Sequence, residues 1–204
     1  MPNNQKDPSK IELDQKFWNT LWENKITHWD IGYPSPAITE FMSKFPDKDA
    51  SILIPGCGNA YEAEFLVKNG FNDITLIDIA PIAVNYIQEK FANYSQIKIF
   101  CEDFFEHDKK YDLIIEQTFF CALDPKKRND YARHSASLLN PNGKIVGLMF
   151  EKDFGKPFPP FGGSQEEYIK TFEPYFEINS MEKCENSIPP RVGTELFVHL
   201  TKKL

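Results

Sequence analysis

The chain has 204 residues, a length typical of one domain, and its composition excludes several classes of protein. Apolar residues make up 41% and charged residues 26% of the chain, with 18 Phe, 8 Tyr and 3 Trp, so the sequence can build a packed interior and is not predicted to be mainly disordered. The net charge of −7 would repel a phosphate backbone, so nucleic acid is not an expected partner.

The sequence also lacks the patterns of a membrane protein or a metal protein. No window approaches the roughly 20 consecutive apolar residues of a transmembrane helix, and the first ten residues lack the apolar core of a signal peptide. We therefore expect a soluble cytoplasmic protein without a membrane partner. The 4 cysteines lie far apart and form no C-x-x-C pair, so we predict neither a zinc site nor a disulfide framework.

The N-terminal segment predicts a small helical cap over residues 14–46. Apolar residues recur at helical spacing behind Asp14, which is placed as an N-cap. A second helical pattern follows Ser35, also placed as an N-cap, and ends at Pro46. Residues 1–13 are polar and lack periodicity, so they are expected to form a flexible tail.

After the cap, short apolar runs alternate with amphipathic stretches, a pattern typical of α/β proteins. The expected strands are 51–55, 73–78, 97–101, 111–117 and 143–150, and the expected helices are 60–69, 80–92, 125–139 and 165–172. The five strands should pair in parallel through helical crossovers. Apolar runs at 176–181 and 196–200 predict a terminal hairpin and hence an antiparallel edge strand. The expected fold is one α/β domain over 14–204, with a Rossmann-like, doubly wound, mostly parallel seven-stranded sheet.

The first expected strand ends in a glycine loop, Gly56-Cys57-Gly58, directly before a helix. In such a fold, glycines at this place let a ligand approach the backbone while helix amides point at it, which predicts a bound cofactor. The alternative is a tight turn that needs glycine only for its positive φ. Tyr61 stands where a dinucleotide loop has its third glycine, and the Gly-Lys-Ser/Thr of a phosphate loop is absent. A nucleoside without phosphates therefore fits better than a dinucleotide.

Acidic residues at the next two strand ends favour an adenosine ligand. Asp78 ends the second strand, where a carboxylate can accept from both hydroxyls of a ribose. Asp103 and Phe104 follow the third strand, where a carboxylate can accept from the adenine amine and a ring can cover the base. An acidic loop that faces water would also explain Asp103, but three successive strand ends with this pattern favour adenosine binding.

Together these residues resemble the class I S-adenosylmethionine-dependent methyltransferases. Within that class the chain resembles the thiopurine S-methyltransferase family, and most closely its halide and thiol methyltransferase branch. The resemblance covers the chain from about residue 14 to its end. It is carried by FW at 17–18, W at 22, WD at 29–30, G at 32, IPGCG at 54–58, FFCALDP at 119–125 with R at 128, and LLNPNG at 138–143.

The resemblance implies a cofactor and its contacts. S-adenosyl-L-methionine would be bound by Trp18, Trp22, Trp29, Gly56, Asp78, Asp103, Phe104 and Gln117. Trp18 and Trp22 are four residues apart, so one helix face can present both indoles to the sulfonium end of the cofactor. Without the resemblance, the same aromatics would be interpreted as residues that dock the helix on the domain.

Two residues depart from the family pattern. At the position of Gln117 the thiopurine enzymes have an arginine and the halide and thiol branch tends to have a tyrosine, and Glu116 replaces the usual Asp. The missing arginine weakens a thiopurine assignment. The missing tyrosine leaves the halide and thiol assignment without its expected polar group.

The end of the fourth strand predicts the methyl acceptor. Methyl transfer from a sulfonium to an anion is an in-line displacement that cancels charge, so a dry pocket favours it, and a thiolate or halide needs no base. Residues 117–121 offer two rings and no histidine or lysine, and Phe119 is the expected pocket residue. Cys121 has apolar neighbours and is expected to be a buried, inert thiol. We expect methyl transfer to a small soft nucleophile such as a thiol, hydrosulfide or halide, with no metal and no assigned catalytic residue.

Several alternatives stay open at this point. An oxygen, nitrogen or metalloid methyltransferase could use the same fold, and so could a non-catalytic protein that binds S-adenosylmethionine. Arg191 is equally expected at the mouth of the acceptor pocket, where it would draw in anions, or on the surface. The sequence does not identify the acceptor or the oligomeric state.

Overall fold

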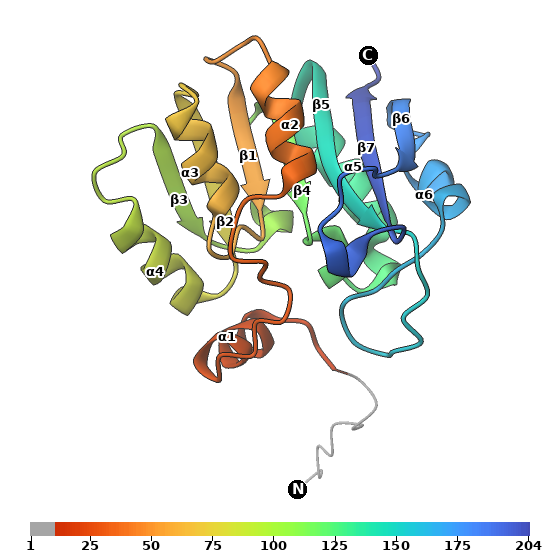
Figure 1. Cartoon of the computed structure of the whole chain (residues 1–204), viewed down its shortest axis with the longest axis horizontal. Helices are drawn as coiled ribbons and strands as arrows, with labels where there is room; N and C mark the ends of the chain where they lie inside the picture. Colours follow the sequence, from red (N-terminus) through yellow and green to blue (C-terminus); the bar gives the residue numbers. More distant parts are fainter. Residues whose placement is uncertain (1–10) are drawn as a thin grey trace, which may run out of the picture.

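A seven-stranded sheet forms the centre of the computed structural model, which describes residues 11–204 (Figure 1). Its strands are β1 (Ser51–Pro55), β2 (Asp73–Asp78), β3 (Ile97–Cys101), β4 (Tyr111–Gln117), β5 (Leu139–Phe150), β6 (Phe176–Lys183) and β7 (Glu195–Lys202). Their order in the sheet is β3-β2-β1-β4-β5-β7-β6. Strands β1 to β5 pair in parallel, whereas β7 is antiparallel to both β5 and β6. The predicted fold class is confirmed, and the predicted tail lies almost wholly outside the described residues.

The strand predictions agree with the structure to within two residues, except at the start of β5. Strands β1 to β4 begin and end where the sequence predicts, but β5 starts at Leu139 because that residue already pairs with Tyr111 of β4. The terminal hairpin is confirmed, and its strand β6 pairs antiparallel with β7 at the edge of the sheet, as predicted. The antiparallel strand β7 lies inside the sheet, where Val198 and Leu200 are fully buried, and the more exposed β6 takes the edge.

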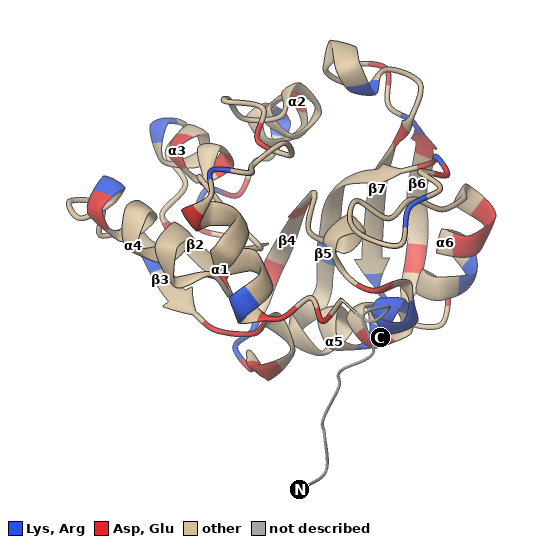
Figure 2. Ribbon diagram, turned by 90° about the horizontal axis from the view of Figure 1, so that it is seen from below, with Lys and Arg blue, Asp and Glu red and all other residues tan. Residues whose placement is uncertain are grey.

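Helices cover both faces of the sheet. They are α1 (Gln15–Glu23), α2 (Pro36–Lys44), α3 (Tyr61–Lys68), α4 (Pro81–Lys90), α5 (Arg128–Leu138) and α6 (Gln165–Phe172). Figure 2 shows α2, α3 and α4 on one side of the strands and α5 and α6 on the other. The predicted helices are confirmed to within two residues, except that residues 125–127 form a separate 3-10 turn before α5. None of the helices in residues 11–204 has the length and apolar character that crossing a bilayer requires.

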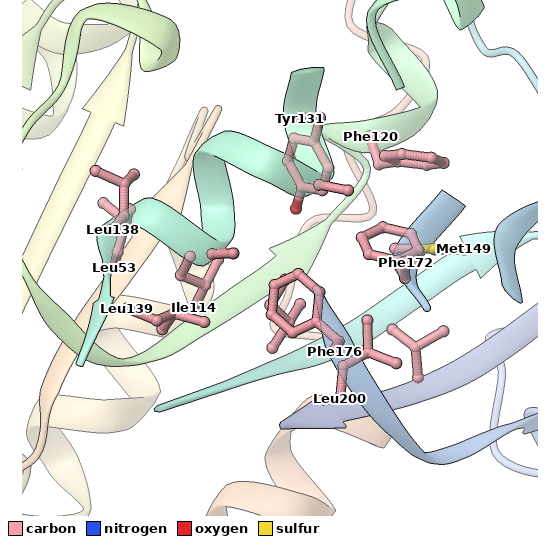
Figure 3. Packing of buried hydrophobic residues seen from close by; sticks show 14 of the residues in the cluster. Leu53, Ile114, Phe120, Tyr131, Leu138, Leu139, Met149, Phe172, Phe176 and Leu200 are labelled. Atoms are coloured by element: carbon pink, nitrogen blue, oxygen red, sulfur yellow. The ribbon is translucent and has the colours of Figure 1, made fainter. Parts of the chain in front are cut away.

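Alternate residues of the central strands supply two apolar cores, because successive side chains of a strand point to opposite faces. On β1, Ile52 and Ile54 join the core beneath α2, α3 and α4, whereas Leu53 joins the core beneath α5 and α6. Figure 3 shows part of this second core, where Phe172 and Tyr131 lie close to Phe120. The two cores fix the strand ends on which the candidate site depends.

The two helices of the predicted N-terminal cap lie in different places: α1 lies beneath the carboxyl ends of the parallel strands, whereas α2 packs on the face of the sheet beside α3 (Figure 1). Asp14 is the predicted N-cap of α1, since its side chain accepts from the Phe17 amide at 2.8 Å. The Asn19 side chain accepts from the Ile82 amide at 3.0 Å, which pairs a backbone donor in the first turn of α4. Ser35 precedes α2 as predicted, but its hydroxyl makes no capping hydrogen bond. The cap is therefore tied to the body of the fold through α4.

Candidate cofactor and acceptor site

The glycine loop after β1 requires glycine for two reasons. Gly56 and Gly58 have φ values of +56° and +50°, in the left-handed region that favours glycine. A Cβ added at Gly56 would lie 2.4 Å from Cδ2 of Phe119, and one added at Gly58 would lie 3.5 Å from the Trp22 ring. The loop is therefore both a tight turn and a place where aromatic side chains approach the backbone closely. The predicted residues Gly56, Phe119 and Trp22 do come together here.

Asp78, at the end of β2, stabilises the conformation of this loop through hydrogen bonds. Its carboxylate accepts from the Gly58 amide at 3.0 Å and from the Ala80 amide at 2.9 Å. Burial raises the pKa of Asp78, and these amide hydrogen bonds oppose the rise. Each carboxylate oxygen keeps a further lone pair, so the role of Asp78 in binding a ribose stays a prediction.

The residues after β3 begin a short turn whose first side chain enters the core. Asp103 accepts from the Phe105 amide at 2.9 Å and so begins the 3-10 turn η1 (Phe104–Glu106). Phe104 is 3% exposed, stacks on Tyr131 at 5.4 Å and meets Phe119 edge-on at 5.2 Å. Phe104 therefore packs against Phe119 from the core. Its contact with an adenine base stays a prediction.

Glu116 shapes the turn at the end of β4. Its buried carboxylate accepts from the amides of Phe119 at 2.9 Å and Phe120 at 2.8 Å. The Tyr131 hydroxyl donates to its other oxygen at 2.7 Å. Burial raises the pKa of Glu116 to about 7, against the effect of these three hydrogen bonds. This carboxyl, which the sequence shows only as a departure from the family, holds Phe119 against the glycine loop.

The three tryptophans of the cap form one aromatic group. Trp29 makes edge contacts with Trp18 at 5.7 Å and with Trp22 at 6.0 Å. Arg191, in the 3-10 turn η4 (Pro189–Arg191), donates to the Trp29 carbonyl at 2.9 Å and lies 3.4 Å from the Glu195 carboxylate. The Arg191 side chain is 11% exposed, so of the two expectations the surface position is excluded. It links the C-terminal part of the chain to the cap.

A pocket of about 50 Å³ lies between the cap and the glycine loop. It is lined by residues 56–59 of the loop, by the cap residues Trp22, Trp29, Asp30, Ile31 and Tyr33, and by Ile54, Tyr61, Glu62, Gln117 and Thr118. Ligand pockets commonly measure roughly 300–1,000 Å³, so side chains at the rim must move to admit a whole nucleoside. A larger cleft of about 400 Å³ on α5 is lined by six other residues, 105, 127, 130, 133, 134 and 137, and shares none with the glycine loop.

The pocket brings together some predicted residues and adds two that the sequence analysis missed. Trp22, Trp29, Gly56 and Gln117 line it, whereas Trp18, Asp78, Asp103, Phe104 and Phe119 do not. The Oε1 atom of Gln117 is buried without a hydrogen-bond partner. The added acidic residues are Asp30 and Glu62, and only the Trp-Asp pair at 29–30 gave a signal for either. Within residues 11–204, no group of three or more histidine, cysteine or carboxylate side chains could hold a metal ion.

The family model for thiopurine S-methyltransferase matches residues 13–198. The chain belongs to this family. A probable thiol methyltransferase 2 from Arabidopsis thaliana is 35% identical over 184 residues, which cover 87% of this chain and 81% of that protein. A thiocyanate methyltransferase 1 from Brassica oleracea is 28% identical over 189 residues, 90% of this chain and 83% of that protein. The predicted family is therefore confirmed.

Solved structures agree with this family assignment at the level of the fold. A magnesium protoporphyrin IX methyltransferase from Synechocystis, solved with bound S-adenosylmethionine, has a TM-score of 0.73 at 14% identity and covers 99% of this chain and 100% of that one. A TehB-like S-adenosylmethionine-dependent methyltransferase from Corynebacterium glutamicum has a TM-score of 0.67 at 17% identity, covering 93% and 98%. The predicted cofactor, S-adenosyl-L-methionine, is confirmed for this family member. The residues fit it, because Trp22 and Trp29 line the pocket with aromatic rings and Gln117 offers an unpaired acceptor there.

Proposed function

We propose that this protein transfers the methyl group of S-adenosyl-L-methionine to a small soft nucleophile, with thiols and hydrosulfide as the first candidates. The observation that carries the proposal is the turn after β4, called the acceptor side here, where Phe119 and Phe120 supply aromatic rings and the nearby carboxyl of Glu116 is fully hydrogen-bonded. Bound S-adenosyl-L-methionine supplies an electrophilic methyl group on a sulfonium sulfur. The chain would have to bind it, orient the acceptor and exclude water.

The titratable groups around Phe119 are all engaged elsewhere. Both oxygens of Glu116 accept hydrogen bonds, from the Phe119 and Phe120 amides and from Tyr131. The thiol of Cys121 is buried, and burial raises its pKa to about 12, so at neutral pH it is protonated and inert. The acceptor must therefore arrive as an anion or lose its proton to water.

The pocket beside the glycine loop supports the same conclusion. Of the residues that line it in the described part of the chain, none is a histidine or a lysine, and the carboxylates of Asp30 and Glu62 already accept hydrogen bonds from protein groups. A thiol ionises at about pH 8.5 without any help from the protein, and halides are always anions, so neither class needs a protein base. Oxygen and nitrogen acceptors are weaker candidates because most of them must lose a proton during transfer.

The residues that would hold the cofactor follow from the contacts described above. Trp22 and Trp29 offer ring faces and edges at the pocket, where aromatic groups attract a sulfonium cation. Asp78 keeps lone pairs for a ribose, and Gly56 lets the ligand approach the backbone. The names of the thiol and thiocyanate methyltransferases from plants support a sulfur acceptor for this chain as well.

The test is an acceptor panel with the full chain and S-adenosyl-L-methionine. Hydrosulfide, two aryl thiols of different acidity, thiocyanate, iodide and a phenol would be compared, with methylated products identified by mass spectrometry. We expect methylation on sulfur, and we expect kcat/KM for each aryl thiol to rise with pH up to that thiol's own pKa. Methylation of the phenol alone, or cofactor binding without turnover of any acceptor, would reject the proposal.

A variant of the acceptor side adds a second test. Phe119→Leu should lower kcat/KM for every thiol, because the ring that lies on Gly56 is replaced by a side chain of different shape. Phe45→Leu is the matched control, since Phe45 packs on Phe41 and Phe71 in the opposite core. Equal effects of the two substitutions on kcat/KM would argue against an acceptor role for Phe119.

A further inference from the structure

We infer that Asp30 and Glu62 form the subsite for the ammonium group at the amino-acid end of the cofactor. The inference rests on the proposed function and deepens it. The two carboxylates come from the cap and from the first turn of α3, and both line the pocket at the glycine loop. They are the acidic residues of this pocket, and neither was among the cofactor residues expected from the sequence.

Asp30 is held across the pocket by hydrogen bonds from both sides. One carboxylate oxygen accepts from the side-chain amide of Asn59 and from the Tyr61 hydroxyl at 3.3 Å, and the other accepts from the backbone amide of Gly32 at 2.7 Å. Asn59 follows the glycine loop directly, and Tyr61 begins α3. The carboxylate of Asp30 is thus positioned from the body of the fold although its backbone belongs to the cap.

Glu62 is positioned in the opposite way, from α3 toward the cap. Its side chain is largely buried, and one oxygen accepts from the Ser35 amide at 2.9 Å, at the start of α2. Burial raises the pKa of Glu62, and no basic side chain makes a hydrogen bond to it. A buried carboxylate of this kind is stabilised by a cation that brings its own donors.

The basic side chains near the pocket already have acidic partners, so a cationic ligand can pair with Asp30 and Glu62. No lysine or arginine lines the pocket in the described part of the chain. Lys90 approaches from outside, where it donates to the Asn59 carbonyl at 3.0 Å and pairs with Glu64 at 3.2 Å. Arg191 donates to the Trp29 carbonyl and pairs with Glu195. Both neighbouring cations therefore have their own acidic partners.

The polar groups of the pocket select between the two cations of the cofactor. Asp30, Glu62 and the unpaired Oε1 of Gln117 are hydrogen-bond acceptors. An ammonium group has three N–H donors, whereas a sulfonium has none, so the ammonium satisfies these acceptors. A water needs about 10–15 Å³ of such space, so a pocket of about 50 Å³ suits a small polar group rather than a nucleoside.

Calorimetric titration of the full chain tests the subsite without turnover. The two ligands are S-adenosylhomocysteine and its deamino analogue, in which hydrogen replaces the amino group. The variants are Asp30→Asn and Glu62→Gln, each of which removes a charge at nearly constant size. The controls are Asp130→Asn and Glu166→Gln, which make the same changes at exposed ion pairs on α5 and α6.

We expect the wild type and both controls to bind S-adenosylhomocysteine at least about tenfold more tightly than the deamino analogue, the size of one charge-assisted hydrogen bond. Each pocket variant should reduce this ratio to about threefold or less, while its affinity for the deamino analogue changes by less than about twofold. Thermal unfolding would be recorded for each variant, and if one of them does not fold, the other variant and the wild-type ratio decide.

Three results would overturn the subsite. They are equal affinities of the wild type for the two ligands, an unchanged ratio in both pocket variants, and equal weakening of both ligands, which would mean a structural role only. If the wild type binds neither ligand, the proposed function itself fails, and the subsite fails with it. A pocket variant that loses the preference for S-adenosylhomocysteine but still binds the deamino analogue would therefore assign the ammonium contact to Asp30 and Glu62.

Discussion

At the scale of single residues, Gly56 is constrained both by its own backbone conformation and by the Phe119 ring. Its φ of +56° favours glycine, and a Cβ there would lie 2.4 Å from Phe119. Gly70 has a φ of +85° but no heavy atom within 4 Å of an added Cβ. Alanine substitutions at these two glycines therefore distinguish two costs in unfolding free energy, that of the backbone conformation and that of a steric collision.

We predict that Gly56→Ala lowers the free energy of unfolding by about 2–4 kcal/mol, whereas Gly70→Ala lowers it by only about 1 kcal/mol. Urea denaturation would measure both. In a Phe119→Ala background the ring is absent and only the Cβ of residue 119 stays close, at 3.2 Å, so the cost of Gly56→Ala should fall toward that of Gly70→Ala. An equal cost of Gly56→Ala in both backgrounds would show that Phe119 does not constrain this position.

Glu116 carries the second prediction at this scale, because burial raises its pKa from 4.5 to about 7. A raised pKa in the folded state adds stability that is fully present below pH 4.5 and is lost as pH rises through about 7. The loss amounts to about 3 kcal/mol at 1.4 kcal/mol per unit. In Glu116→Gln this titration is absent.

The unfolding free energy of the wild type should therefore exceed that of Glu116→Gln by about 3 kcal/mol more at pH 4.5 than at pH 7.5. Urea denaturation of both proteins across this range gives the difference directly. The comparison cancels the titration of all other groups that the two proteins share. A difference that stays constant or grows with pH would contradict the raised pKa.

At the scale of elements, the cap is joined to distant parts of the chain by single polar contacts. Arg191 joins it to the turn before β7, through the Trp29 carbonyl. Its acidic partner, Glu195, is 2% exposed, and the second carboxylate oxygen of Glu195 has no partner. Removing Arg191 would leave this buried carboxylate without a counter-charge.

We predict that Arg191→Met lowers the free energy of unfolding by about 3 kcal/mol, since a buried charge is left uncompensated. Adding Glu195→Gln should recover a large part of this loss. Arg133→Met, which removes an exposed ion pair with Asp130, is the control and should change stability little. If the double variant is no more stable than Arg191→Met, the loss comes from the cap contact rather than from Glu195.

At the scale of the whole molecule, the attachments of the cap imply that it unfolds together with the sheet. Asn19 bonds to the Ile82 amide, Ser35 to Glu62, and Arg191 to Trp29. All 3 tryptophans of the chain, at positions 18, 22 and 29, lie in the cap. Tryptophan fluorescence therefore observes the cap alone, whereas far-ultraviolet circular dichroism observes the whole fold.

We expect the two signals to give the same midpoint in urea, as a single cooperative transition requires. Titration with S-adenosylhomocysteine should also change the fluorescence, because Trp22 and Trp29 line the pocket. A fluorescence midpoint well below that of circular dichroism would mean that the cap opens independently. An Asn19→Ala variant should move the two midpoints apart, since it removes the link to α4.

Some features of the molecule depend on local sequence and could be predicted from it. Strands β1 to β4, the N-cap at Asp14 and the glycine loop at 56–58 follow from apolar period, capping residues and turn residues over a few neighbouring positions. The start of β5 was missed because the pairing of Leu139 with Tyr111 overrides a turn signal at residues 140–143. The place of β7 inside the sheet is likewise set by long-range pairing.

The order of the elements, the glycine loop and the family of the chain can all be recognised in the amino-acid sequence. Which side chains share the pocket depends on the folded arrangement of the chain. Asp30 and Glu62 are far apart along the chain, as are Gly56 and Phe119, or Trp29 and Arg191. Capping and periodicity act between neighbours, whereas these contacts arise only when the packing of the two cores brings distant segments to one end of the sheet.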